Sequence, residues 1–294
     1  MMILSIIITL YNRKELVTRA IESVVKLAED YNVEILIIDD GSNDNPLEKI
    51  STYLTKNNVN YYYKENGGAG DAKNFGANLA NGKYIIFLDS DDYLINTQSL
   101  LKLINDKIKE DYDFLYSKSV IIKRNESEVE LFSADLDEIE DDLYKYMLRY
   151  PLHYPGKPTY IFKRAAFIDS KGFNANFRWG DAMLFWRKFL KNKSYYEITF
   201  PTYVYDQSGS DSVSRNRDST FYRKVYETLS YTYEDIEKEL TQNKSNVNWV
   251  VILFLLSLQQ LNFNHALKYF SIMCFNPLRT LKTLSFLVRK RKQK

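Results

Sequence analysis

Two periodicities alternate along the first 110 residues, and this alternation constrains the fold more than any other feature of the chain. Short apolar runs rich in β-branched residues predict strands at residues 4–8, 33–38, 60–63 and 84–88, and helical spacing predicts helices over residues 16–27, 46–53 and 72–80. Strands that are apolar on both faces and linked through helices pair in parallel through right-handed crossovers. The sequence therefore predicts an α/β fold with a mostly parallel sheet, which binds ligands at the carboxyl ends of its strands.

Polar and acidic residues follow three of the predicted strands. The first strand runs into Thr9-Leu10-Tyr11-Asn12, the second into Asp39-Asp40-Gly41-Ser42, and the fourth into Asp89-Ser90-Asp91-Asp92. Such residues often only terminate strands and cap the helices that follow. Five carboxylates at one edge, however, repel one another unless a cation or hydrogen-bond donors compensate them. The pattern therefore favours a divalent metal with a diphosphate ligand at this edge.

A glycine-rich segment, residues 66–74 (NGGAGDAKN), leads into the third predicted helix. Backbone amides at a helix N-terminus favour anions, and Lys73 lies one turn into the helix. No GxGxxG follows the first strand and no Gly-Lys-Ser/Thr is present, so the segment is neither a dinucleotide fingerprint nor a Walker A loop. These observations exclude an NAD enzyme and a P-loop NTPase.

The composition limits the chemistry of such a site. The lone cysteine, Cys274, excludes a disulfide framework and a zinc ribbon, and we expect it to be a buried apolar residue. The two histidines, His153 and His265, argue against a histidine-built metal site and a Ser-His-Asp triad. A metal here needs oxygen ligands, which Mg²⁺ and Mn²⁺ prefer.

No segment has the pattern of a signal or a membrane span. The run from Met1 to Leu10 lacks a basic n-region and a small-residue cleavage site, and is better explained as a buried strand. The longest later apolar run, Trp249–Leu258, has ten residues, which is too short to cross a bilayer. We therefore expect a cytoplasmic protein.

Together these motifs resemble those of the family 2 glycosyltransferases, which have the GT-A fold. The resemblance rests on Thr9, Tyr11 and Asn12, on residues 35–45 (ILIIDDGSNDN) and on residues 66–92, which end in an acidic DXD-type signature. It continues through Lys163-Arg164 and Gly172-Phe173 to Trp179-Gly180-Asp181 and Arg187, and it covers roughly residues 3–215. The family usually has Glu-Asp where this chain has Gly180-Asp181.

The resemblance implies a domain organisation and a donor site. Residues 1–218 form a GT-A domain with a Rossmann-like sheet, of which 1–110 bind the nucleotide-sugar and 111–218 the acceptor. Residues 219–294 form a helical, basic appendage. In the family pattern Thr9, Tyr11 and Asp40 line the base, Lys73 lies near uracil or phosphate, and Asn12, Asn66 and Ser90 complete the donor site. Asp89 holds the ribose or sugar side, and Asp91 coordinates Mn²⁺ or Mg²⁺ that bridges the diphosphate, with a weaker claim for Asp92.

The catalytic group implied by the resemblance is Asp181, as the general base that takes the acceptor hydroxyl proton. Because the family is inverting, a single displacement without a covalent intermediate follows. An amphipathic run after Asp181 places the carboxylate at a helix start, where it can also be only a favourable helix-terminal charge. Arg178 and Trp179 either stack on an acceptor sugar or pack beneath the loop. The polar loop over residues 205–215 is either a lid over the donor or an ordinary surface loop.

The C-terminal region is apolar and basic. Residues 240–294 carry nine Lys and Arg and no Asp or Glu, whereas residues 1–239 carry 31 basic and 38 acidic side chains. After a helix over about residues 220–240, helices are expected at 249–261, 266–275 and 278–288, followed by the basic cluster 289–294. Apolar helices with a basic cluster favour an anchor on an anionic cytoplasmic leaflet. A helical cap and a dimerisation surface remain alternatives, and no nucleic-acid module is recognised.

The sequence thus predicts an inverting, metal-dependent glycosyltransferase, peripheral on the inner face of the cell membrane. Its donor would be a nucleotide-sugar, most simply a UDP-sugar. Its acceptor would be a glycan such as a lipid-linked oligosaccharide in the synthesis of bacterial capsule, lipopolysaccharide or another surface polysaccharide. Transfer to a protein or to a teichoic-acid-like polymer is an alternative acceptor class. A catalytically silent glycan-binding scaffold for another transferase and a nucleotidyltransferase are the competing functions.

Overall fold

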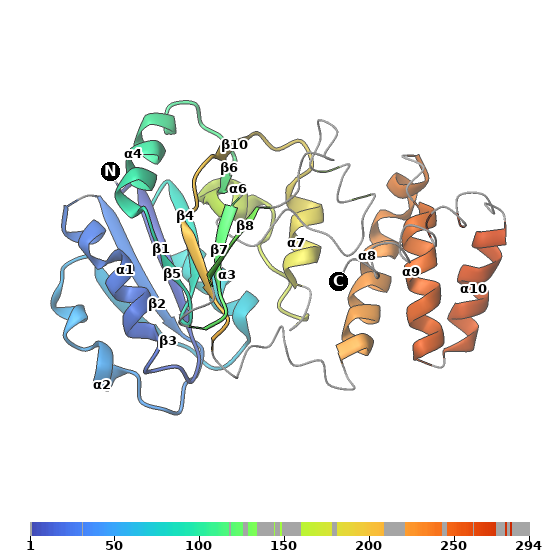
Figure 1. Ribbon diagram of the computed structural model, residues 1–294, viewed down its shortest axis with the longest axis horizontal. Coiled ribbons are helices and arrows are strands. Elements are labelled where there is room, and N and C mark those ends of the chain that lie inside the picture. Colours follow the sequence, from blue (N-terminus) through green and yellow to red (C-terminus); the bar gives the residue numbers. More distant parts are fainter. Residues whose placement is uncertain are drawn as a thin grey trace. The chain divides into compact units, whose positions relative to one another are not determined.

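The structure is a computed structural model of the chain, and its elements are shown in Figure 1. It describes residues 2–30, 32–117, 119–125, 129–133, 160–177, 181–208, 221–242, 246–260 and 262–274, with Tyr144, Leu148, Thr280 and Thr283. The chain divides into two compact units. The first comprises residues 1–136, 155–178 and 188–210, and the second comprises 137–154, 179–187 and 211–294. The predicted boundary at residue 218 stays a prediction.

A seven-stranded sheet forms the centre of the first unit. Its strands are β1 (Leu4–Leu10), β2 (Val33–Asp39), β3 (Val59–Tyr63), β4 (Tyr84–Asp89), β6 (Phe114–Ser117), β9 (Tyr160–Lys163) and β10 (Tyr195–Ile198). They lie in the order β10-β6-β9-β4-β1-β2-β3. All adjacent pairs are parallel except those made by β9, which is antiparallel to both β4 and β6. The predicted mostly parallel sheet is confirmed.

A smaller sheet holds the segment that follows β4. It consists of β5 (Tyr93–Leu94), β11 (Tyr203–Asp206), β7 (Ser119–Lys123) and β8 (Val129–Ser133), in the order β5-β11-β7-β8. Strand β5 pairs antiparallel with β11 immediately after the acidic residues that end β4. The chain near residue 205 is therefore brought beside the acidic turn.

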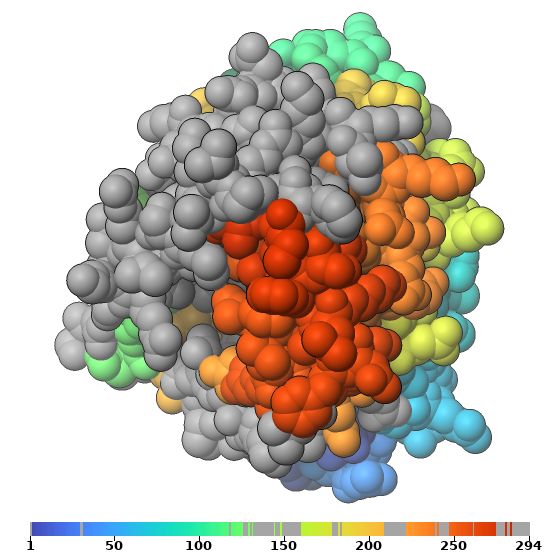
Figure 2. Space-filling view, turned by 90° about the vertical axis from the view of Figure 1, so that its right-hand side faces the viewer, coloured from blue at the N-terminus to red at the C-terminus, as the bar shows by residue number. Residues whose placement is uncertain are grey.

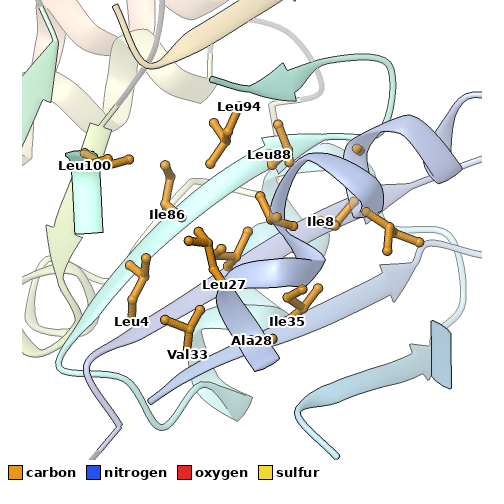
Figure 3. Packing of buried hydrophobic residues seen from close by; sticks show 14 of the residues in the cluster. Leu4, Ile8, Leu27, Ala28, Val33, Ile35, Ile86, Leu88, Leu94 and Leu100 are labelled. Atoms are coloured by element: carbon orange, nitrogen blue, oxygen red, sulfur yellow. The ribbon is translucent and has the colours of Figure 1, made fainter. Parts of the chain in front are cut away.

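Helices cover both faces of the large sheet. On one face lie α1 (Val17–Asp30) and α4 (Thr97–Lys107), and Figure 3 shows α1 packed over the apolar side chains of β1, β2 and β4. On the other face lie α3 (Ala69–Leu79) and α6 (Arg164–Asp169). There Gly76 lets α3 approach β1 closely, because an added Cβ would lie 2.4 Å from Ile7 Cγ2. The first unit also contains α2 (Leu47–Ile50) and a 3₁₀ turn at Tyr53–Thr55, whereas most of α7 (Asp181–Phe189) belongs to the second unit.

The second unit has its own helical core. Its helices are α8 (Phe221–Gln242), α9 (Asn246–Gln259) and α10 (Phe263–Cys274), and α9 packs against both α8 and α10. Trp249 is fully buried and its indole N–H donates to the Leu148 carbonyl at 2.7 Å. Within the described ranges, no helix combines the length and the apolar content that crossing a bilayer requires.

Most predicted elements are present with small shifts of their bounds. The four predicted strands are each one or two residues longer in the structure, and α3 begins at Ala69 instead of residue 72. The helix predicted over residues 46–53 is only the single turn of α2 followed by the 3₁₀ turn. Cys274 is exposed at the end of α10, so its predicted burial is wrong. The predicted helix 278–288 and the basic cluster lie outside the described residues, apart from Thr280 and Thr283.

Candidate active site

The strand register brings the three polar turns to one edge of the sheet. Thr9 on β1 is level with Asp89 on β4, and Leu10 is level with Asp39 on β2. The Thr9 hydroxyl donates to Asp89 Oδ1 at 3.1 Å, which ties the ends of two strands together. The convergence predicted from the sequence is therefore present in the structure.

Asp40 forms hydrogen bonds with the glycine-rich segment. Its side chain is 4% exposed, and its carboxylate accepts hydrogen bonds from the amides of Gly67 (2.9 Å) and Gly68 (2.7 Å). The Lys64 ammonium lies 2.7 Å from Asp40 Oδ1, and the side-chain amide of Asn66 donates to the backbone carbonyl of Asp40 at 2.8 Å. The sequence indicated that these backbone amides favour an anion. The anion that they hold is a carboxylate of the chain itself.

Asp39 and Asn12 fix the turn after β2. Asp39 Oδ1 accepts the Ser42 amide at 2.8 Å, and its other oxygen accepts the Tyr61 hydroxyl. Asn12, with a left-handed φ of 51°, accepts the Asn43 amide on its side-chain oxygen at 2.8 Å, while its own amide donates to Ser42 Oγ at 2.9 Å. Asparagine tolerates this conformation better than most residues. The turns after β1 and β2 thus form one connected structure.

Asp89 remains partly open to solvent. Its side chain is 40% exposed and lies 2.9 Å from the Lys73 ammonium on α3. Burial raises the pKa of Asp89, but the Lys73 charge and hydrogen bond, with the Thr9 hydroxyl, outweigh it and hold the pKa below its usual value. Asp89 is therefore an ionised carboxylate beside a cation.

Asp91 forms an ion pair with Arg13, and its side chain is 25% exposed. Burial and the charge of Asp89 raise the pKa of Asp91, and the Arg13 guanidinium opposes them. A like charge that raises a carboxylate pKa is relieved by an added cation, so this carboxylate is suited to bind one. Ser90, between the two carboxylates, is buried, and its amide donates to the Thr9 carbonyl at 3.1 Å.

Asp92 is a buried structural carboxylate. It accepts the Tyr203 hydroxyl at 2.8 Å and the Asp206 amide at 2.8 Å, and so joins the end of β4 to β11. Burial, with the charges of Asp89 and Asp91, raises the pKa of Asp92 to about 8. Arg19 on α1 also connects the turn after β4 to β11, because it donates to Asp206 Oδ2 at 2.7 Å and to the Asp91 carbonyl.

The sequence reasoning missed the groups that neutralise the acidic edge. These are Arg13, Arg19, Lys64, Tyr203 and the Asp206 amide. Arg13 follows the first polar turn directly, so its proximity to that turn was a usable signal. Tyr203 and Asp206 lie more than 100 residues from Asp92, and no local pattern marks them as its partners.

The carboxylates at this edge of the sheet suit a divalent metal only together with oxygen atoms from a bound phosphate ligand. The described residues contain no group of three or more His, Cys, Asp or Glu arranged to hold a metal. Mg²⁺-type sites at phosphates, however, use one or two carboxylates together with substrate oxygens and water. Asp91 and Asp89, two partly exposed carboxylates on one turn, fit that description.

The other predicted residues lie in different surroundings. Tyr11 is 46% exposed and Asn66 is exposed on the same edge. Asp181 is the first residue of α7, as expected for a carboxylate at a helix start. Arg178 and Trp179 lie outside the described residues. The roles assigned to all these residues stay predictions.

The comparisons with known proteins identify the family. The family described as "Glycosyl transferase family 2" matches residues 5–192, which is more than half of the chain. The chain belongs to this family of glycosyltransferases, so the family and the class of enzyme predicted from the sequence are confirmed.

Similar sequences include transferases that act on several bacterial polymers. A β-1,3-glucosyltransferase from Campylobacter jejuni, named for a GalNAc(5)-diNAcBac-PP-undecaprenol acceptor, is 27% identical over 82% of this chain and 76% of its own length. A poly(ribitol-phosphate) β-glucosyltransferase from Bacillus spizizenii is 29% identical over 78% of this chain and 31% of its own length. An uncharacterised glycosyltransferase from Rickettsia felis is 41% identical over 42% of this chain, and the match spans 20% of that relative.

Solved structures share the fold. TarS residues 1–349 from S. aureus in complex with UDP-GlcNAc superimposes with a TM-score of 0.65 at 21% identity, over 87% of this chain and 71% of that chain. A mannosyltransferase from Pyrobaculum calidifontis in complex with GDP-mannose and Mn²⁺ gives a TM-score of 0.56 at 12% identity, over 97% of this chain and 84% of that chain. The predicted GT-A fold with C-terminal helices is confirmed.

Proposed function

We propose that this chain transfers a sugar from a UDP-sugar to a glycan acceptor with inversion at the anomeric carbon. The observation that carries the proposal is the open acidic pair at the carboxyl edge of the sheet. Asp89 and Asp91 keep 40% and 25% of their side chains exposed and are paired with Lys73 and Arg13, so charged groups of both signs face solvent together. UDP as the nucleotide is supported by TarS, a structural neighbour that binds UDP-GlcNAc.

The donor would lie across the ends of β1, β2 and β4. Tyr11, Asn12 and Asn66 are exposed there and would contact the nucleoside, and the buried Thr9 and Ser90 would complete the site. Asp40 would act through Gly67 and Gly68, whose backbone amides donate to its buried carboxylate. Lys73 would then meet the diphosphate, because its ammonium already pairs with Asp89 at this edge.

Asp91, with Asp89, would hold Mn²⁺ or Mg²⁺ at the diphosphate. A divalent cation there stabilises the negative charge that develops on the leaving nucleoside diphosphate. Asp181 would accept the proton of the attacking hydroxyl, and a positioned carboxylate contributes about 10²–10⁴-fold to such a step. The acceptor's new bond to the anomeric carbon forms as the bond to the diphosphate oxygen breaks.

The acceptor would be a lipid-linked glycan of a bacterial surface polymer. This proposal is supported by the Campylobacter relative, whose name carries an undecaprenol-linked acceptor and which aligns over most of both chains. A teichoic-acid-type polymer is the second candidate, favoured by the Bacillus relative named for poly(ribitol-phosphate). Arg178 and Trp179 would contact the acceptor.

An exposed apolar surface on α9 and α10 supports a lipid-linked acceptor. Phe263, Leu267 and Phe270 follow one another along α10 at helical spacing and are 63%, 66% and 50% exposed, and Leu255 and Leu258 on α9 are 45% and 40% exposed. Figure 2 shows α10, in red, on the face of this unit turned to the viewer. Because residues 240–294 carry only basic charges, we propose that this face binds an anionic cytoplasmic leaflet, where interfacial helices insert apolar side chains.

Calorimetric titration of UDP, first with Mn²⁺ and then with EDTA, tests the donor site. We expect binding that requires the metal and that Asp181→Asn retains, while UDP release from UDP-sugars falls at least about 10²-fold in that variant. Equal loss of UDP binding in Asp181→Asn would refute its role as the base. Failure of UDP to bind in either condition would contradict UDP as the donor nucleotide and would direct the same titration to dTDP, GDP and CMP. If none of the four nucleotides binds, the remaining candidate function is the catalytically silent, glycan-binding scaffold.

Flotation with liposomes tests the membrane proposal separately. The full chain should float with vesicles that contain phosphatidylglycerol and remain unbound with pure phosphatidylcholine. Replacing Phe263, Leu267 and Phe270 by Ser should abolish flotation, whereas Tyr222→Ser, a change at an exposed aromatic residue on α8, should not. Equal flotation of both variants would overturn the assignment of this face.

A further inference from the structure

Arg19 on α1 binds two acceptors that are distant in the sequence. Its guanidinium donates through Nη1 to the Asp206 carboxylate at 2.7 Å and through Nη2 to the backbone carbonyl of Asp91. The two acceptors lie 187 and 72 positions from Arg19 along the chain. Because a guanidinium is planar and its nitrogens keep fixed relative positions, one side chain that satisfies both acceptors also fixes where each lies relative to the other.

Two further contacts hold the residues that follow Asp91 against the same face of α1. The guanidinium carbon of Arg19 lies 4.8 Å from the centroid of the Tyr93 ring, within the range of a cation–π contact. The Leu94 amide donates at 3.2 Å to the hydroxyl of Ser23, which is one turn after Arg19 on the helix. Since residues four apart share one face of a helix, α1 contacts the chain from Asp91 to Leu94 along one side.

Asp206 is a firmly held partner for Arg19. Its side chain is 3% exposed, and its amide donates to the Asp92 carboxylate at 2.8 Å. The carboxylate oxygen that Arg19 does not contact accepts the amide and the hydroxyl of Ser208 at 2.8 and 2.6 Å. Burial raises the pKa of Asp206, but the Ser208 hydrogen bonds and the Arg19 guanidinium outweigh it and hold the pKa below its usual value. Arg19 is thus paired with an ionised carboxylate that is itself bonded to the turn after β4.

We propose that Arg19 is a positioning residue, which orients the Asp91 carboxylate toward the cation by fixing the main chain of Asp91. The inference rests on the proposed function, because it takes Asp91 as a metal ligand. The Asp91 side chain is 25% exposed, so its carboxylate reaches solvent while its carbonyl is bound to α1. Mg²⁺-type sites tolerate little departure from octahedral geometry. A rotation of this peptide would therefore weaken metal binding without removing a ligand.

Arg19→Lys is the sharpest variant, because it keeps the charge and removes the two-nitrogen contact. A lysine ammonium is a single point of contact, and the Asp206 carboxylate attracts it more strongly than the Asp91 carbonyl does. Arg164→Lys is the matched control, since Arg164 also donates from two nitrogens, to the carbonyls of residues 77 and 78 at 3.0 and 3.1 Å. Arg164 lies beside the start of β4, whereas the acidic turn follows the end of that strand.

Hydrogen exchange of the metal-free protein tests the contact itself. In Arg19→Lys, amide exchange should accelerate by about tenfold in peptides that cover residues 90–95 and stay unchanged in β2 and β3. Arg164→Lys should accelerate exchange only near the end of α3. Unchanged exchange over residues 90–95 in Arg19→Lys would overturn the role of Arg19 in fixing this segment.

Titration of Mn²⁺ in the presence of UDP then measures the effect on the cation. Arg19→Lys should weaken Mn²⁺ binding by about tenfold, the lower end of the loss that follows when a contact behind a metal ligand is removed, and Arg164→Lys should stay within about twofold of the wild type. UDP release from UDP-glucose and UDP-N-acetylglucosamine, with water as the acceptor, should need correspondingly more Mn²⁺ and recover at saturation. A lower rate in Arg19→Lys with unchanged Mn²⁺ affinity would show a general loss of structure and overturn the positioning role.

A double variant tests whether Arg19 acts through Asp91. Because Asp91→Asn has already lost the charged metal ligand, adding Arg19→Lys to it should lower the rate of UDP release by less than about twofold further. Full additivity of the two losses would mean that Arg19 acts by another route.

Failure of the proposed function and failure of the positioning role give different results. If the wild-type protein binds neither UDP nor Mn²⁺, the proposed function fails and the metal role of Arg19 fails with it, while the exchange data still show whether Arg19 fixes the turn. If the wild type binds both and Asp91→Asn loses the metal dependence, but Arg19→Lys binds Mn²⁺ as tightly as Arg164→Lys, then the proposed function stands and the positioning role is wrong.

Discussion

The turn after β2 and the turn after β4 contain similar clusters of aspartates, yet the structure uses them differently. Asp39 and Asp40 are buried and accept hydrogen bonds from Tyr61, from the Ser42 amide and from the two glycine amides of residues 67 and 68. Asp89 and Asp91 are partly exposed and form ion pairs with the cationic side chains of Lys73 and Arg13. The first cluster builds the edge of the sheet, and the second is open to a ligand.

The difference teaches which property distinguishes a structural carboxylate from a binding one. Both clusters end parallel strands, so position in the fold does not separate them. Backbone amides are fixed donors that a ligand cannot displace without breaking a turn, whereas the ion pairs of Asp89 and Asp91 are made by side chains, whose rotation does not disturb the backbone. Asp92 shows that the contrast holds within one turn, because it is buried and bonded to Tyr203 and the Asp206 amide.

The largest expected effect is on stability and concerns Asp40. Asp40→Asn should lower the free energy of unfolding by about 3 kcal/mol, because it leaves the partly buried Lys64 with a weakened partner and places an amide nitrogen against the donors that the carboxylate satisfied. For a domain of this size the melting temperature should fall by about 6–12 °C. Thermal unfolding of the variant and the wild type measures this fall in melting temperature.

Asp71→Asn is the matched control for that change. Asp71 also pairs with Lys64, at 2.7 Å, but its side chain is 38% exposed. Exposed ion pairs contribute about 0–1 kcal/mol, so this variant should melt close to the wild type. Equal destabilisation by the two substitutions would show that the loss comes from Lys64 alone and not from the amides held by Asp40.

The next effect is on activity and concerns Asp91. Asp91→Asn should reduce turnover of the UDP-sugar by about 10²-fold and abolish the metal dependence of UDP binding, since it removes a charged oxygen ligand of the proposed cation. Stability should change by less than about 0.5 kcal/mol, as for other exposed sites. Titration and melting curves on one preparation measure both, and Asp106→Asn, at an exposed aspartate of α4, controls for charge. A variant that melts early with intact metal dependence would place Asp91 among the structural carboxylates.

The sequence predicted the large sheet well because its strands are buried on both faces. Short runs such as residues 84–88 (YIIFL) are continuously apolar and lie between turn residues, and the ends of these strands then locate the acidic edge. The helix expected over residues 46–53 was too long, because the single turn of α2 buries only Ile50, and the following Ser51 and Thr52 are weak helix formers.

The sequence did not predict which aspartates are structural. It favoured a metal for five carboxylates, whereas three of them are compensated by hydrogen bonds from Tyr61, Tyr203 and backbone amides and by the Lys64 cation. These partners are set by strand pairing across the sheets, and the contact between Tyr203 and Asp92 spans 111 residues. Periodicity and local motifs carry no record of such pairings. The two carboxylates that remain, Asp89 and Asp91, are the ones that the family pattern assigns to the sugar side and the metal, whereas that pattern also gave Asp40 a place beside the base.

The smallest expected effect concerns Arg13, the cation that pairs with Asp91. Arg13 competes with a divalent metal for the Asp91 carboxylate, so Arg13→Gln should strengthen Mn²⁺ binding by about threefold, the value of one partly exposed ion pair. Titration of Mn²⁺ in the presence of UDP measures this change, with Lys14→Gln as the control because Lys14 pairs with the exposed Glu48 instead. If Arg13→Gln instead weakens UDP binding with no change in the affinity for Mn²⁺, then Arg13 contacts the diphosphate directly. The acidic edge of the sheet would in that case supply the donor site with a cation as well as with carboxylates.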